Sequence, residues 1–138
     1  MFQAFRTSAS GLTAERLRMD TIANNLANAN TTRTESGGAY RRQMVVFAPI
    51  QESGGIRRKT MGQGVKVVGI VEDSSPSRII YDPQHPDANI DGYVELPNVH
   101  VVKEMVDLIT ATRAYEANIT AINSAKSMAQ KALEIGRG

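Results

Sequence analysis

Cysteine and tryptophan are absent from this chain of 138 residues, and only 5% of its residues are aromatic. The absence of cysteine excludes disulfides, thiolate catalysis and cysteine zinc sites. The two histidines, His85 and His100, are separated by a proline-rich segment and lack the i, i+4 spacing of a helical metal site. No phosphate-binding loop, nucleophile elbow or glycine fingerprint occurs either. We therefore predict a protein that is not an enzyme and that holds no metal and no cofactor.

The sequence also has no long apolar run, and the segment after Met1 lacks the basic, apolar and small-residue parts of a secretory signal. We expect no direct membrane insertion and no standard secretion route. Basic and acidic residues number 16 and 14, which gives a net charge of +2. This balance does not require a nucleic acid or an anionic membrane as partner, although the pI of about 9.1 permits weak contact with either.

Two segments at opposite ends of the chain carry apolar residues at heptad spacing. In the first segment, the residues at this spacing are Phe5, Leu12, Met19 and Leu26. In the second segment, one set repeats every seven residues and another is interleaved: Val101, Leu108, Tyr115, Ile122 and Ala129, with Met105, Ile119 and Leu133. Such spacing is typical of coiled-coil helices. We predict that both faces serve in helix pairing and as assembly interfaces.

The lengths of the two predicted helices indicate that they pair with each other and also need neighbours. A helix over residues 99–135 is about 55 Å long, whereas a compact globule of this chain length is roughly 37 Å across. The first helix, over residues 2–28, is about 40 Å long and leaves part of the second uncovered. We expect other subunits to cover the exposed part.

Between the helices, residues 40–47, 64–72 and 77–81 are rich in valine and isoleucine and are bounded by glycine, serine and proline. Their connections are too short to contain a crossover helix, which favours antiparallel pairing. The predicted fold class is mainly α with a small β insert: long N- and C-terminal helices pair as a coiled-coil-like hairpin, with a small antiparallel β module between them.

This pattern divides the chain into three parts. Residues 1–30 and 98–138 are the two helices of one helical domain, and residues 31–97 are a linker and the β module. Because residues 31–38 contain no apolar anchor, we predict that they form a flexible connector.

Small and polar residues interrupt the helices at specific points. Gly11 costs about 1 kcal/mol in a helix relative to alanine, and because it lies among serines and alanines it predicts a close approach between helices. The alternative is that the first ten residues become helical only on assembly. Asn98 is predicted to cap the second helix, and Gly136 to end it.

Asparagines cluster at the end of the first predicted helix, at positions 24, 25, 28 and 30. One interpretation is a helix stop and turn, in which the amides bond free carbonyls and asparagine adopts the left-handed cap conformation. The other is polar contact between subunits. For this reason Asn24, Asn25 and Asn28 are included among the predicted assembly residues.

The sequence supports two further kinds of site, for calcium and for nucleic acid, only weakly. Asp87, Asn89 and Asp91 match the start of an EF-hand loop, but Asn98 replaces its final glutamate and prolines break the helix that should precede it, so a turn is favoured over calcium binding. Basic clusters at residues 41–42 and 57–59 make a coiled-coil nucleic-acid-binding protein the alternative function. Few aromatics accompany them, and we predict no nucleic acid partner.

The terminal motifs resemble those of a known family. SASGL at residues 8–12 and NNLANANT at residues 24–31 resemble the N-terminal signature of the axial proteins of the bacterial flagellum. EMVDLITATRAYEAN at residues 104–118 resembles their C-terminal helix. The short proximal-rod members are similar in further segments, namely residues 81–87, 91–99 and 131–136. Distal-rod and hook relatives have larger middle domains than this chain. The alternative to this assignment is another short axial rod protein.

The resemblance implies a structural subunit of the flagellar basal-body proximal rod. Such subunits self-assemble with other rod proteins into a hollow, torque-transmitting shaft that crosses the periplasm. They are exported through the flagellar type III export apparatus without a cleaved signal peptide. The implied partners are other rod subunits, basal-body proteins and copies of the chain itself in a helical assembly. The terminal helices are expected to form the inner tube, and the β module to face adjacent subunits.

Overall fold

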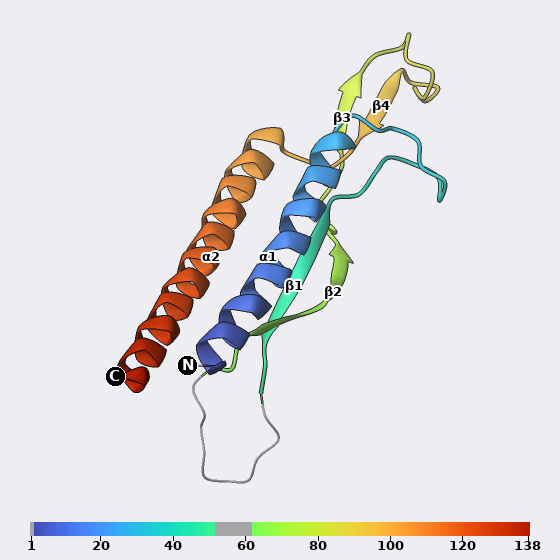
Figure 1. Cartoon of the computed structure of the whole chain (residues 1–138). Helices are drawn as coiled ribbons and strands as arrows, with labels where there is room; N and C mark the ends of the chain where they lie inside the picture. The colour runs from blue at the N-terminus through green and yellow to red at the C-terminus, as the bar shows by residue number, and fades with distance from the viewer. Residues whose placement is uncertain (1, 52–61) are drawn as a thin grey trace.

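The computed structural model describes residues 2–51 and 62–138, which form two long helices and, between them in sequence, two β-hairpins (Figure 1). In chain order the elements are α1 (Phe2–Ala27), β1 (Gln43–Pro49), β2 (Val65–Glu72), β3 (Arg78–Tyr81), β4 (Tyr93–Leu96) and α2 (Val101–Arg137). Neither helix contains proline, so nothing interrupts its backbone hydrogen bonds. The predicted fold class, mainly helical with a small antiparallel β insert, is confirmed.

The two helices lie side by side and antiparallel, with both chain ends at the same end of the molecule (Figure 1). Three contacts set their register. The Asn25 amide bonds the Glu104 carboxylate, the Thr112 hydroxyl lies 3.5 Å from the Met19 sulfur, and Gly11 faces Asn118. Continued to its start, this register places Phe2 opposite about residue 128. The last eight residues of α2, 130–137, therefore extend beyond α1, and we call them the overhang.

The first hairpin pairs β1 with β2 antiparallel, and its register shifts between Val46 and Phe47. It packs against α1 on the side away from α2 (Figure 1). One point of attachment is the Ser10 hydroxyl, which accepts the backbone N–H of Val65 at 3.1 Å. The strands predicted at residues 40–47 and 64–72 are thus confirmed, with β1 beginning three residues later than expected.

The second hairpin pairs β3 with β4 antiparallel and lies beyond the C-terminal end of α1 (Figure 1). The third strand predicted at residues 77–81 is therefore present, but it pairs with an unpredicted strand, β4, instead of extending a single sheet. Gly92 ends the connecting loop with a φ of 85°, and a Cβ there would lie 2.9 Å from the Tyr81 ring. Both constraints favour glycine at this position.

The connector predicted at residues 31–38 makes polar contacts with other segments at its beginning. The Thr32 hydroxyl donates to the Asp87 carboxylate at 2.6 Å, and Arg33 forms an ion pair with the same carboxylate. The backbone N–H of Tyr40 also donates to the Thr31 carbonyl at 3.0 Å. The contacts of Thr32 and Arg33 with the β3–β4 loop are polar, so the absence of apolar residues in this segment did not reveal them.

The start of α2 also differs from expectation. His100, not Asn98, occupies the N-cap position, and its side chain makes no capping hydrogen bond. Asn98 is buried and bonds other segments instead. The helix continues one residue past Gly136 and ends at Arg137. In the described part of the chain, no helix is long and apolar enough to cross a membrane.

Candidate assembly interface

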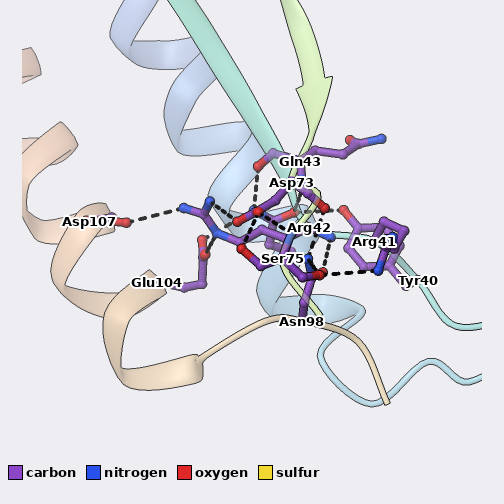
Figure 2. Close-up of polar contacts among 10 residues, drawn as sticks. Tyr40, Arg41, Arg42, Gln43, Asp73, Ser75, Asn98, Glu104 and Asp107 are labelled. Carbon is purple, nitrogen blue, oxygen red and sulfur yellow. Dashed lines mark hydrogen bonds and ion pairs between the residues drawn. The ribbon is translucent and has the colours of Figure 1, made fainter. Parts of the chain in front are cut away.

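A buried polar cluster joins the helix pair to the first hairpin, and Figure 2 shows its contacts. We call it the polar junction and define it as Asn25, Arg42, Asp73, Asn98 and Glu104. Glu104 comes from the first turn of α2 and is 0% exposed. Its carboxylate forms an ion pair with the Arg42 guanidinium, which also contacts Asp73 at 3.2 Å and Asp107 at 3.6 Å. A buried charge is tolerated because it is paired in this way.

Asn25, on α1, uses both ends of its amide in the polar junction. Its Nδ2 donates to the Gln43 carbonyl at 2.9 Å and to Glu104 at 3.3 Å. Its Oδ1 accepts the Tyr40 hydroxyl at 2.8 Å and the backbone N–H of Gln43 at 3.0 Å. One fully buried side chain thereby connects α1, α2 and the start of β1. In this conformation Asn25 is not accessible to a neighbouring subunit.

Asn98 plays the same part from the segment before α2. Its Oδ1 accepts the backbone N–H of Arg42 at 2.8 Å, and its Nδ2 donates to the carbonyls of Asp73 at 3.0 Å and Ser75 at 3.1 Å. All of these bonds go to segments more than twenty residues away in sequence. The sequence offered only the local signal of a helix cap, so this role was missed.

The charges of the polar junction stabilise one another. Burial alone lowers the pKa of Arg42, but hydrogen bonding and Coulombic attraction from Glu104 and Asp73 outweigh it, and the pKa lies above its ordinary value. The pKa of Asp73 lies below its ordinary value, first because the Ser75 hydroxyl and backbone N–H donate to its carboxylate, and then because Arg42 attracts it. Both shifts favour the ionised forms of Arg42 and Asp73 at neutral pH.

The inner face of α2 packs against α1, because α1 is the only helix or strand of the described chain in close contact with α2. A series of buried or half-buried residues runs along this face at alternating spacings of four and three: Glu104, Leu108, Ala111, Tyr115, Asn118, Ile122, Ala125 and Ala129. The predicted series Leu108, Tyr115, Ile122 and Ala129 lies on this face. The residues that alternate with this series, Glu104, Ala111, Asn118 and Ala125, are small or polar. A pattern of large apolar residues therefore did not predict them.

The other predicted residues of α2 are not covered by α1. Val101, Met105, Ile119 and Leu133 are all at least 38% exposed. A correction to the heptad interpretation follows: Val101, Met105 and Ile119 lie off the face that pairs the helices, and Leu133 lies in the overhang, beyond the reach of α1. Part of this exposed surface is an apolar row at helical spacing, which we call the outer stripe and define as Val102, Met105, Val106 and Ile109.

The predicted heptad face of α1 is also displaced from the centre of the helix contact. Phe5, Leu12, Met19 and Leu26 are half-buried, whereas the fully buried residues of α1 are Gly11, Ala14, Thr21, Ile22 and Asn25. The physical reason is that α1 packs on two sides, against α2 and against the first hairpin. Small side chains allow both approaches: a Cβ on Gly11 would lie 2.8 Å from Nδ2 of Asn118.

Asn28 stabilises the end of α1, as the stop-and-turn interpretation predicts. Its Nδ2 donates to the Asn24 carbonyl at 2.9 Å and contacts the Asn24 side chain at 3.2 Å. Asn24 itself is exposed and donates to the Tyr40 hydroxyl at 3.1 Å. The expected left-handed asparagine is wrong, since in residues 2–51 and 62–138 only glycines have positive φ.

The remaining candidate residues that the structure describes form hydrogen bonds or ion pairs within the chain. Arg41 donates to the Ser75 carbonyl and the Ser77 hydroxyl, and Arg42 is part of the polar junction. The basic cluster at residues 57–59 lies outside the described residues.

Asp87, a candidate calcium ligand, is bonded by Thr32 and Arg33. The backbone N–H of Asp87 donates to Nδ1 of His85, which confirms His85 as a turn residue. Among the residues described, no three metal-ligating side chains gather.

Comparison with known proteins matches both ends of the chain to flagellar families. Residues 5–33 match the family described as "Flagella basal body rod protein". Residues 90–135 match "Flagellar basal body rod FlgEFG protein C-terminal". The two matches contain β4 and nearly all of α1 and α2, so they include most of both helices of the pair.

Several curated relatives align along their whole length. The flagellar basal-body rod protein FlgC of Borreliella burgdorferi is 49% identical, with 100% of this chain and 99% of the relative aligned. FlgC of Bacillus subtilis is 48% identical over 99% of this chain and 98% of the relative, and FlgC of Salmonella typhimurium is 39% identical over the same shares. The chain therefore belongs to the FlgC family of flagellar basal-body rod proteins and is a structural rod subunit of the basal body.

Proposed function

We propose that this protein forms part of the wall of the proximal rod by packing its helix pair against neighbouring subunits. The observation that carries the proposal is the outer stripe of α2. Val102, Met105, Val106 and Ile109 are between 53% and 75% exposed, on the face of α2 opposite the one that packs on α1. Contiguous exposed apolar surface of this kind marks an interaction site.

The half-buried flank of α1 supplies a second contact face. Phe5, Leu12, Met19 and Leu26 follow one another every seven residues along the helix. Their partial burial leaves apolar area that a neighbouring helix can cover. Together with Val101, Ile119 and Leu133, these residues extend apolar surface around both helices. Asn24 and Asn28 lie at the end of this flank and offer polar contacts there.

The remaining predicted residues act within the subunit. Leu108, Tyr115, Ile122 and Ala129 hold α2 on α1, and Asn25 holds the pair on the first hairpin. We assign them the role of setting the shape of the assembling unit. Rigid pairing matters for a shaft that transmits torque, because ordering a loose helix on assembly costs conformational entropy.

Many such contacts in parallel suit a torque-transmitting, hollow shaft. Full burial of one large apolar side chain contributes about 1.5 to 3 kcal/mol, so a stripe of four supplies several kcal/mol for each subunit added. In this proposal residues 1–30 and 98–138 form the axial helical domain, and residues 31–97 the outward β module. Partners are other rod subunits, basal-body proteins and copies of the chain.

The route to the rod is part of the same proposal. The protein reaches a periplasm-spanning position through the flagellar type III export apparatus, without a cleaved signal peptide. The absence of disulfides suits this route, since the chain has no cysteine to oxidise. The proposal assigns the protein no catalytic step.

Substitution in the outer stripe tests the proposal. Met105→Asp and Val106→Asp are expected to leave the unfolding transition unchanged, because both side chains are exposed. Both variants should be missing from isolated basal bodies, and the cells should lose motility. The matched control is Thr110→Asp, which places the same charge on an exposed position of α2 outside the stripe. Normal rods containing Met105→Asp would refute the assignment of the stripe.

A further inference from the structure

The second hairpin presents one apolar, aromatic side to solvent. Its register pairs Ile79 with Glu95 and Tyr81 with Tyr93, so these four side chains share that side. Ile79 is 69% exposed and Tyr81 67% exposed, and the Tyr81 and Tyr93 rings pack edge to face with centroids 5.3 Å apart. We call Ile79, Tyr81, Tyr93 and Glu95 the hairpin patch. Tyrosine is enriched among the residues that contribute most to protein interfaces.

The rest of the hairpin holds the patch in a fixed shape. Val94 points to the opposite side and is completely buried. In the loop, the Asn89 side chain accepts the backbone N–H of Tyr93 at 2.9 Å, and the backbone N–H of Asn89 donates to the Tyr93 carbonyl at 2.9 Å. Thr32 ties the loop to the connector through Asp87. A partner therefore meets a patch that is already ordered, which lowers the entropic cost of binding.

The charge around the patch has one sign. Residues 79–102 contain neither lysine nor arginine, and they contain four acidic residues: Asp82, Asp87, Asp91 and Glu95. Asp87 pairs with Arg33, whereas the other three form no ion pair within the described part of the chain. Asp91 and Glu95 are exposed. A surface that carries lysine or arginine beside apolar side chains is complementary to this patch in both charge and burial.

The size of the patch suits a single helix. β3 and β4 have four residues each, so the patch is about 13 Å long, with its two strands about 5 Å apart. A helix is about 10 Å across and rises about 5.4 Å per turn. One helix laid along the hairpin therefore covers both strands over about two turns.

The position of the patch bears on which chain supplies that helix. The second hairpin lies at the end of the long axis opposite both chain termini, so a partner seated there adds length along the axis (Figure 1). A head-to-tail contact between copies of one chain repeats with every copy and builds an open filament. A rod made of several kinds of subunit needs an end contact that accepts another kind. Residues 90–135 match a family described by the FlgEFG proteins, so a helix related to α2 is present in rod proteins of other names.

We propose that the hairpin patch binds the terminal helix of a different rod protein, through a helix face that carries lysine or arginine beside apolar side chains. This inference rests on the proposed function and assigns one of its contacts to a partner of another kind. The outer stripe is a separate surface, because it lies on α2 and has the exposed basic residues Lys103 and Arg113 beside it. The two surfaces therefore favour partners of opposite charge.

A crosslink from cysteine to lysine tests the contact in a chain that has no cysteine of its own. Cells would express Ile79→Cys as the sole copy, and a short reagent with a maleimide and a succinimidyl ester would be applied to isolated basal bodies. We expect mass spectrometry to identify a product with a lysine in the terminal helix of a different rod protein. Tyr93→Cys, on the other strand, should give the same product. The control Val68→Cys, equally exposed on β2, should give at least tenfold less of it.

Charge reversal then tests the complementarity. Glu95→Arg in the Ile79→Cys chain should reduce the product several-fold, because the acidic border of the patch becomes basic. Arginine is chosen because it does not react with the ester. The matched control is Glu72→Arg, which reverses an exposed charge on the first hairpin and should leave the yield unchanged.

The outcomes separate this inference from the proposed function. A product that joins two copies of this chain, a lysine outside a terminal helix, or no product from rods that contain both cysteine variants would overturn the inference and leave the proposed function intact. An unchanged yield from Glu95→Arg would also overturn it. Absence of the unmodified chain from isolated rods would instead refute the proposed function.

Discussion

The buried carboxylate of Glu104, on α2, forms an ion pair with Arg42, the residue that immediately precedes β1. This contact links two segments that are 62 positions apart in sequence. Asn25 completes it by bonding Glu104 from α1. One carboxylate thus holds both helices and the first hairpin in a single arrangement, and the outer stripe one half-turn away faces solvent as a result.

Removing the charge of Glu104 should destabilise the fold strongly. Glu104→Ala leaves Arg42 partly buried without its main partner, and loss of one member of a buried pair costs about 3 to 5 kcal/mol. Urea unfolding followed by circular dichroism measures this difference. The matched control is Asp107→Asn, which removes the more distant carboxylate, 3.6 Å from Arg42 and partly exposed. Its expected cost is below about 1 kcal/mol. Equal effects of the two variants would contradict the central role of Glu104.

A large side chain at Gly11 should separate the helices. Gly11→Leu overpacks a site where a Cβ already lies 2.8 Å from Nδ2 of Asn118, and overpacking typically costs about 1 to 3 kcal/mol. Gly11→Ala should be close to neutral, because the Asn118 amide can shift and alanine gains about 1 kcal/mol in helix propensity. Thermal unfolding compares both with Ala9→Leu, which adds the same side chain at an exposed position of α1. A Gly11→Leu variant as stable as Ala9→Leu would argue against the close approach.

Stability should fall when the medium becomes more acidic than about pH 4. The pKa of Asp87 lies below its ordinary value, first because the Thr32 hydroxyl donates to it and then because Arg33 pairs with it. A folded-state pKa below the unfolded one means that the carboxylate stabilises the fold above the unfolded pKa. That contribution disappears as the pH falls from about 4 through the folded pKa. Asp73 acts in the same direction.

The measurement is the free energy of unfolding between pH 7 and pH 2, for the wild type and for the double variant Asp73→Asn and Asp87→Asn. The double variant should be less stable at pH 7 and should show a shallower loss between pH 4 and pH 2. Parallel curves would show that these two carboxylates do not carry the pH dependence.

Shortening α2 should separate stability from assembly. Deletion of residues 130–138 removes a part of the helix that is exposed throughout. We expect the midpoint of chemical unfolding to stay within the range of a surface substitution, about 0.5 kcal/mol. Incorporation into rods should be lost. A deletion that assembles normally would argue that the overhang makes no contact, and one that unfolds the chain would show that the overhang stabilises the free subunit.

Much of the architecture could be predicted from local patterns. The heptad spacing, the absence of proline and the helix lengths led to two long paired helices with one end uncovered, and valine-rich segments led to β1, β2 and β3. β4 was missed because Tyr93–Leu96 is only four residues long. Short strands carry too little periodicity to be recognised alone.

The faces of the helices were harder to predict. The heptad spacing assigned Met105 to the face that pairs the helices, yet Met105 is exposed while Glu104 and Asn25 are buried. Polar residues become buried only where partners from distant segments satisfy them, and no local pattern contains those partners. The same reason explains why Asn98 was expected to cap a helix and in fact joins Arg42 to the segment from Asp73 to Ser75.

The sequence by itself determined the class of the molecule, its terminal helices and its family, because spacing and motif identity are local properties of the chain. Only the tertiary structure decided which side of each helix is buried inside the subunit. That choice follows from packing α1 between α2 and the first hairpin, which requires small residues such as Gly11 and a neutralised buried charge at Glu104. It leaves the outer stripe and the overhang free for neighbours.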